Sequence, residues 1–257
     1  MRRRMDVNSD MGESFGNWVM GDDAALLPLV TTANVACGFH AGDPVTLLRT
    51  VRLAKRSGVV VGAHPGLPDL LGFGRRAMKI SPEDAYAYVV YQVGALQAAL
   101  AVEGMRLHHV KPHGAFYSVL KADEELAQAV AEAIASLSPE PILYWPAPTD
   151  SALPRAVRKR GGRVVGEIYV DLEYAADGSL IIQRTKHVTD VAKAIAQVRR
   201  YVDAGEVLAQ DGTAVALDAE SICVHGDGPN ALDVARGVRR TLEEAGCLAE
   251  PVLARAA

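Results

Sequence analysis

The stretch TTANVACGFHAGDP, residues 31–44, contains the repeating unit that decides the fold. Its run ANVAC (33–37) is short and apolar, as buried strands are. The pair Asp43-Pro44 is a helix N-cap followed by proline at the first helical position, so a helix is expected to begin there. Between them, small residues surround His40. Strand, polar turn and helix in this order are the unit of an α/β protein.

The same unit recurs along the chain. Short apolar runs predict about seven buried strands at residues 5–8, 33–37, 59–63, 107–111, 141–145, 163–170 and 221–225. Cap signals and helical patterns predict helices at residues 43–58, 81–104, 123–136, 150–160, 189–204 and 229–245. Strands that alternate with helices imply parallel strands joined by right-handed crossovers.

The number of units favours an α/β fold of the deformed seven-stranded (β/α) TIM-like barrel type, as a single domain over residues 1–257. An open doubly wound sheet is less favoured, because no convincing nucleotide fingerprint follows the first strand. The pattern GxxxxGK[ST] does not occur in the sequence. If ATP is used, it is therefore bound by other means or by a partner.

Composition indicates a soluble globular protein whose ligands are small molecules or proteins. The chain has 257 residues, 49% of them hydrophobic, and a net charge of -4, which gives no long-range reason to bind nucleic acid or an anionic membrane. We expect no signal peptide, since Asp6 and Asn8 stand where its apolar core would lie, and no apolar run long enough to span a bilayer. Three widely spaced cysteines without a CxxC pair suit a reducing compartment, so a cytoplasmic location is expected.

Polar residues follow most of the predicted strands, where the carboxyl ends of parallel strands meet. We therefore expect one shared pocket. The catalytic candidates are Asp10, Glu13, His40, His64 and His113. The candidates for substrate binding are Asn8, Asn34, Arg75, Lys111, His225 and Asp227.

The chemistry of this pocket has two interpretations. Two histidines and a carboxylate from different strands can hold a divalent metal, with Asp10, His40 and His64 as candidate ligands. Without metal, the same groups can relay protons to a leaving amine. Sequence spacing does not choose between them. Any single histidine, taken alone, is as readily explained by hydrogen bonds to the backbone as by a role in the pocket. Cys37 is expected to be a small buried residue, and the pair His108-His109 lies inside a strand with one face in the core.

Five motifs together resemble one known family. DVNSDMGESFGNW, ANVACGFHAGDP, GAHPGLPDLLGFGRR, VKPHGAFY and CVHGD occur in the order and at the intervals of the LamB/YcsF family, from Met5 to about Ala245. The resemblance implies a barrel of the glycoside hydrolase/deacetylase type and ATP-dependent opening of the lactam ring of 5-oxo-L-proline to L-glutamate. It also implies 5-oxoprolinase subunits B and C as partners and ATP as co-substrate. Whether the chain also forms a homo-oligomer stays open.

Carried over by position, the polar residues of the family fall on Asp6, Asn8, Asp10, Glu13, His40, Asp43, His64, Arg75, Lys111, His113, His225 and Asp227. One departure concerns the sixth strand exit, where Asp171 is followed by Leu172 and the family usually has arginine, unless Arg184 compensates. Two other functions stay open: a stand-alone metal-dependent amide hydrolase or sugar deacetylase, and a non-catalytic partner.

Overall fold

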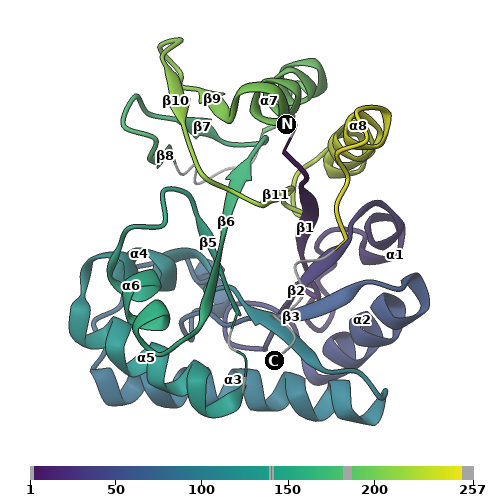
Figure 1. The fold of residues 1–257 in the computed structure, drawn as a ribbon. Coiled ribbons are helices and arrows are strands. Elements are labelled where there is room, and N and C mark those ends of the chain that lie inside the picture. The colour runs from purple at the N-terminus through teal and green to yellow at the C-terminus, as the bar shows by residue number, and fades with distance from the viewer. Residues whose placement is uncertain (1–2, 139, 141, 182–186, 251–257) are drawn as a thin grey trace.

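Seven parallel strands close into a barrel with the helices on its outside (Figure 1). In this computed structural model, residues 3–138, 140, 142–181 and 187–250 are described. The barrel order is β1-β11-β6-β5-β4-β3-β2, and β1 pairs with β2 to complete the ring. The strands are β1 (Asp6–Met11), β2 (Thr32–Ala36), β3 (Val60–His64), β4 (Leu107–Val110), β5 (Ile142–Pro146), β6 (Arg163–Tyr169) and β11 (Ser221–Cys223). The predicted TIM-like barrel is confirmed.

All six predicted helices are present, within a few residues of their expected ends. The α-helices are α1 (Asp23–Leu26), α2 (Pro44–Ser57), α3 (Pro82–Val102), α4 (Gly114–Ala122), α5 (Glu124–Leu137), α6 (Ala152–Lys159), α7 (Val191–Ala204) and α8 (Ala231–Glu244). Two 3₁₀ turns are η1 (Leu27–Leu29) and η2 (Leu70–Gly72). Helices α1 and α4 were not predicted: α1 is a single turn, and α4 begins with a glycine close to Pro112, a pair that reads as a turn.

The cap of α2 fixes the loop that carries His40. The Asp43 carboxylate accepts hydrogen bonds from the backbone N–H groups of Val45 and Thr46, each at 2.9 Å, as its predicted N-cap role requires. Its second oxygen accepts from the backbone N–H of Gly16 at 2.9 Å. One carboxylate thus ties the loop after β1 to the loop after β2, which places two walls of the barrel mouth relative to each other.

The chain between β6 and β11 contains two hairpins that the sequence pattern did not predict. They are β7 (Glu173–Tyr174) with β8 (Leu180–Ile181), and β9 (Glu206–Leu208) with β10 (Ala214–Ala216), near α7 at the top of Figure 1. Strands of two or three residues are too short to show a period of two. Arg184, considered above as a substitute for the missing arginine, lies outside the described residues.

Helix α3 corrects the expectation that no segment is long and apolar enough to span a bilayer. Its 21 residues meet that criterion by length and composition. In the fold it packs on the barrel between α2 and α5, with Val89, Val93 and Leu96 fully buried. A core helix of a large barrel passes the same test of composition, since one face meets the strands and the flanks meet other helices.

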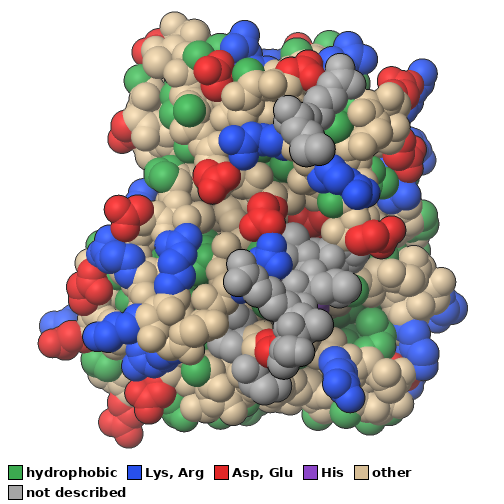
Figure 2. Space-filling model, in the orientation of Figure 1, with side chains coloured by type: hydrophobic (Ala, Val, Ile, Leu, Met, Phe, Trp, Pro, Cys, Tyr) green, Lys and Arg blue, Asp and Glu red, His purple; other side chains and the backbone are tan. Residues whose placement is uncertain are grey.

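The interior of the barrel is polar. Asp6, Asn8 and Asp10 alternate with Val7, Ser9 and Met11 along β1, and all six are buried. The hydroxyl of Tyr144 on β5 donates to Asp6 across the barrel at 3.1 Å, so this face of β1 points inward. On the outer surface in Figure 2, basic and acidic side chains are interspersed, in keeping with the small net charge. The charged groups that converge in this structure, such as Asp10, Lys111 and Glu167, therefore lie inside the barrel.

Candidate active site

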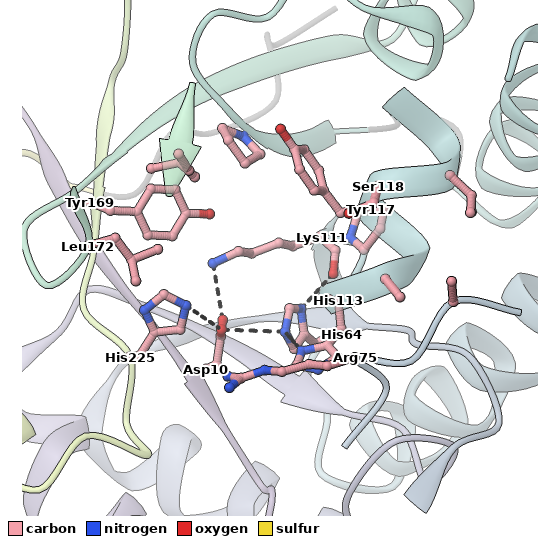
Figure 3. Close-up of a pocket in the computed structure, with 17 residues that line it drawn as sticks. Asp10, His64, Arg75, Lys111, His113, Tyr117, Ser118, Tyr169, Leu172 and His225 are labelled. Atoms are coloured by element: carbon pink, nitrogen blue, oxygen red, sulfur yellow. Dashed lines mark hydrogen bonds and ion pairs between the residues drawn. The ribbon is translucent and has the colours of Figure 1, made fainter. Parts of the chain in front are cut away.

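A cavity of about 300 Å³ opens at the carboxyl ends of the strands, and Asp10 lines it between His225, Lys111 and His64 (Figure 3). Six predicted site residues line it: Asp10, His64, Arg75, Lys111, His113 and His225. Asn8 and Asn34 lie deeper in the barrel and contact Asp10 or Lys111. Glu13, His40 and Asp227 border this set without lining the cavity. The predicted shared pocket therefore exists, in two layers.

The two carboxylate oxygens of Asp10 have different surroundings. Its Oδ1 accepts from Asn34 Nδ2 at 2.8 Å and from Lys111 Nζ at 3.1 Å. Its Oδ2 lies 3.4 Å from His64 Nε2 and 3.8 Å from His225 Nε2. Burial would raise the pKa of Asp10, but the charges on His64 and Lys111 outweigh it, so this pKa lies well below its usual value. Asp10 is an anion with one oxygen held and the other facing two imidazoles.

Lys111 is paired inside the barrel. Its Nζ lies 3.1 Å from Asp10 Oδ1, 3.3 Å from Glu167 Oε2 and 3.1 Å from Cys223 Sγ. Burial would lower the pKa of Lys111, but the neighbouring carboxylates hold it well above its usual value. With two acids this close, the ammonium mainly neutralises its neighbours, and its predicted role in substrate binding stays a prediction.

His64 and His113 face each other at 2.9 Å, from Nε2 to Nδ1. Their outer nitrogens contact backbone carbonyls: His64 Nδ1 lies 2.6 Å from the oxygen of Lys111, and His113 Nε2 lies 2.8 Å from that of Phe73. Each carbonyl needs an N–H donor, and the contact between the rings needs a third, whereas two neutral imidazoles carry only two. Burial lowers the pKa of His113 well below its usual value, and the third donor in this arrangement is one proton shared between the two rings, beside the Asp10 anion.

A divalent cation could take the place of that shared proton. With both facing nitrogens unprotonated, each ring would keep its outer N–H on a carbonyl, the arrangement that orients histidine ligands of metals. One ligand atom from each of Glu13, His40, His64 and His113 lies within 4.8 Å of the others. The predicted third ligand, Asp10, groups instead with Cys223 and His225, although its Oδ2 contacts His64. The donor set fits a divalent ion such as Zn²⁺.

Glu13 and His40 form a buried pair behind the cavity. Glu13 Oε1 lies 3.9 Å from His40 Nε2, and the His40 ring stacks on His113 with centroids 3.8 Å apart. Neither ring nitrogen of His40 has a hydrogen-bond partner among the described residues. Burial and the nearby Asp10 charge raise the pKa of Glu13 well above its usual value. The pKa values of Glu13 and Asp10 are thus shifted in opposite directions, a pattern typical of acid–base sites.

His225 belongs to a carboxylate–imidazole pair that the sequence did not reveal. The Asp171 Oδ2 lies 2.9 Å from His225 Nδ1 and accepts from the His225 backbone N–H at 3.1 Å. This contact leaves Nε2 facing the cavity and Asp10. A carboxylate that orients a histidine is a recurrent device of proton transfer. Only the position of Asp171 at a strand exit could have signalled it.

The outer part of the cavity is less charged. The Arg75 guanidinium donates from Nη2 to Asp227 Oδ2 at 3.2 Å and extends over the ring of Phe73. Leu172, at the position where arginine was expected by resemblance, lines the cavity with Leu180.

Burial raises the pKa of the Cys37 thiol to about 12, which excludes it as a thiolate nucleophile at neutral pH.

The closed parallel barrel, with carboxyl and imidazole groups converging at its carboxyl end, defines a TIM-like barrel with a candidate acid–base site where such barrels place their active sites. The model of the LamB/YcsF family matches residues 5–256, and the chain belongs to this family.

Known proteins of similar sequence and structure agree. The chain is 50% identical to the A subunit of 5-oxoprolinase from Bordetella pertussis over 248 residues, which cover 96% of this chain and 98% of that protein. The crystal structure of the lactam utilization protein from Thermus thermophilus superposes with a TM-score of 0.88 at 46% identity, covering 98% of this chain and all of that one. A family 4 carbohydrate esterase from Streptomyces lividans shares the fold, with a TM-score of 0.50 at 15% identity.

Proposed function

We propose that the chain is the A subunit of a 5-oxoprolinase, which opens 5-oxo-L-proline to L-glutamate at the expense of ATP. The observation that carries the proposal is the 50% identity to the A subunit of a 5-oxoprolinase over nearly the whole length of both chains. The cavity supports it, because the anionic Asp10 and the imidazoles of His64, His113 and His225 line a space of about 300 Å³, with Glu13 and His40 behind it.

The chemistry explains the need for ATP. A lactam carbonyl is a poor electrophile, and its phosphorylation on oxygen makes the carbon attackable. Water then adds to that carbon, the C–N bond breaks as the nitrogen takes up protons, and a second water hydrolyses the resulting acyl phosphate to glutamate and phosphate. Since the chain has no GxxxxGK[ST] sequence, we assign the binding of ATP and the phosphorylation to the B and C subunits.

In this reaction Asp10 accepts a proton from the attacking water. Its Oδ2 faces the cavity between the Nε2 atoms of His64 and His225, at 3.4 and 3.8 Å. Glu13, whose pKa is raised by burial, and His40 lie behind His113. They can supply the protons that the leaving amine takes up. Arg75 is the cation placed to bind the substrate carboxylate, and it stays oriented by Asp227. Asn8 and Asn34 act on substrate only through Asp10 and Lys111.

A divalent ion held by Glu13, His40, His64 and His113 would supply a polarised carbonyl and a bound water of lowered pKa. This cluster favours a second candidate function, a metal-dependent amide hydrolase that needs no ATP. Elemental analysis of the purified chain, with and without chelator, and turnover of lactams or N-acetyl sugars without ATP test it. A preparation that binds no divalent ion and gains no activity from added Zn²⁺ would exclude this second function.

Reconstitution tests the main proposal. The purified chain mixed with B and C subunits, ATP and 5-oxoproline should form glutamate and ADP in equal amounts, whereas omission of the chain, of ATP or of either partner should abolish glutamate. The control is the same mixture with heat-denatured chain. A complete mixture that hydrolyses no 5-oxoproline, although all three subunits are folded, would refute the proposal.

A further inference from the structure

His109 lies inside the barrel, one layer below the cavity, and the proposed reaction does not use it. Its side chain comes from β4, is 1% exposed and does not line the cavity. Its Nε2 lies 2.6 Å from Asn34 Oδ1. Asn34 Nδ2 in turn donates to Asp10 Oδ1 at 2.8 Å. A continuous path of side-chain hydrogen bonds therefore links His109 to the oxygen by which Asp10 is held.

The carboxylates of the site fix the orientation of each amide in this path. Asn8 Nδ2 lies 3.0 Å from Glu167 Oε2, a carboxylate that accepts, so Asn8 Oδ1 faces Asn34 at 2.8 Å. Asn34 must then donate to both Asn8 and Asp10, which directs its own Oδ1 toward His109. It follows that His109 carries its proton on Nε2. Its Nδ1 accepts from His108 Nδ1 at 3.0 Å.

The fold holds the His109 ring in one place. Gly62 on the neighbouring strand β3 leaves the space for it, since a Cβ at residue 62 would lie 2.1 Å from His109 Cε1. On another side, the Tyr144 ring lies with its centroid 4.2 Å from that of His109. A glycine within a strand is otherwise unfavourable, and here the close approach of an imidazole explains it.

We propose that His109 is a positioning residue: its Nε2–H fixes the Asn34 amide, which holds Asp10 Oδ1 and so aims Oδ2 at the cavity. The assignment of Oδ2 as the proton acceptor rests on the proposed function, whereas the positioning of the carboxylate does not. Loss of the donor frees the Asn34 amide to rotate and releases one of the contacts that hold Asp10. Leu at position 109 removes the donor, and Gln retains an N–H at nearly the same distance from the backbone.

The kinetic test uses the reconstituted complex with six variants of the chain. His109→Leu should lower kcat by about 10- to 100-fold with KM unchanged, as loss of a partner behind a catalytic group does. His109→Gln should keep most of the wild-type kcat. Gly62→Ala should lower kcat as His109→Leu does, because its methyl displaces the ring, and should cost nothing further in a His109→Ala background. The matched control is His187→Leu, at an exposed histidine that does not line the cavity.

A structural arm separates this proposal from the proposed function. Crystal structures of wild type, His109→Leu and His109→Gln should show the Asn34 amide and the Asp10 carboxylate displaced in the leucine variant alone. This result needs no activity and decides the positioning role even where a folded wild-type complex forms no glutamate. An unmoved Asp10 in His109→Leu, or equal loss of kcat in the leucine and glutamine variants with thermal stability retained, would overturn the proposal.

Discussion

Asp10 is held by one carboxylate oxygen and faces the cavity with the other, so a change that spares the first oxygen tests the second. In Asp10→Asn, the side-chain oxygen can still accept from Asn34 and Lys111, but an NH₂ group then faces His64 and His225, where a base is needed. We expect the rate of glutamate formation to fall by about 10²- to 10⁴-fold, the usual contribution of a general base.

The control for this prediction is Asp211→Asn, a change of the same kind at an exposed turn, which should leave the rate as it is. Initial rates in the reconstituted complex at saturating 5-oxoproline and ATP provide the measurement. If Asp10→Asn retains more than about a tenth of the wild-type rate, Asp10 is not the base.

Asp6, at the other end of the same strand, predicts a pH dependence of stability. Burial raises the pKa of Asp6 from 3.8 to about 6 in the folded chain. Above the unfolded value the unfolded state loses this proton first, so its contribution to stability is complete below pH 3.8 and is lost as the pH rises through 6. The full effect is about 3 kcal/mol, from a rise of roughly two pKa units at 1.36 kcal/mol each.

Asp6→Asn removes this proton from both states and keeps an oxygen that accepts from Thr32 and Tyr144. From pH 4.5 to 7.5, the free energy of unfolding of the variant should rise relative to wild type by roughly 2 kcal/mol. Urea denaturation of both proteins at the two pH values measures this difference, in which all other titrating groups cancel. A difference that is constant with pH would show that Asp6 is ionised in the folded chain throughout this range.

Among the elements, the loop between β3 and α3 contains glycines whose missing side chains leave room for the histidines of the site. Gly74 has φ of 63°, and a Cβ there would lie 2.6 Å from His40 Cβ and 2.8 Å from His113 Cδ2. Gly58, which ends α2, has a similar φ of 68° but no atom within 4 Å of such a Cβ. A side chain at either position would therefore meet the same strain from the left-handed backbone, but only a side chain at residue 74 would also contact the site.

Gly74→Ala should therefore destabilise the chain by about 1–3 kcal/mol more than Gly58→Ala, the usual cost of overpacking. It should also lower kcat, because His40 and His113 must move, whereas Gly58→Ala should leave kcat unchanged. Chemical denaturation and steady-state rates of the two variants provide the comparison. Equal losses of stability and activity would mean that the loop relaxes away from the histidines.

The sequence predicted elements where the signal is local and long enough. Strand runs of four or more residues and capped helices such as that beginning at Asp43 were found, because burial periodicity and caps are local properties. Helix α4 and the two short hairpins were missed, since a Gly-Pro environment reads as turn and strands of two residues have no period. Polar residues at strand exits converged as expected, because a parallel barrel brings those ends together.

The internal network was beyond prediction from one sequence. Asn8 bonds Glu167, which is 159 residues away, and His225 bonds Asp171 through a contact set only by the closure of the ring. Polar residues inside strands resemble surface positions when read alone, so Asp6 and Glu167 gave no sign of facing each other and Asn8 across the barrel interior. What remained hidden is therefore which polar residues pair with each other, rather than which strand exits meet.

At the scale of the whole molecule, closure of the barrel predicts that the chain unfolds as one unit. Each of the seven strands pairs with two neighbours, so loss of any strand exposes two edges. The segment with α7 lies in the chain between two adjacent barrel strands, β6 and β11.

Trp145 on β5 is 1% exposed and Trp18 is 68% exposed, so Trp18→Phe leaves one tryptophan that reports on the barrel. In this variant, urea unfolding followed by Trp145 fluorescence and by far-UV circular dichroism should give coincident midpoints and slopes. Loss of helical signal at lower urea than the change at Trp145 would show instead that part of the helical shell unfolds independently of the ring, and that residues 1–257 are more than one cooperative unit.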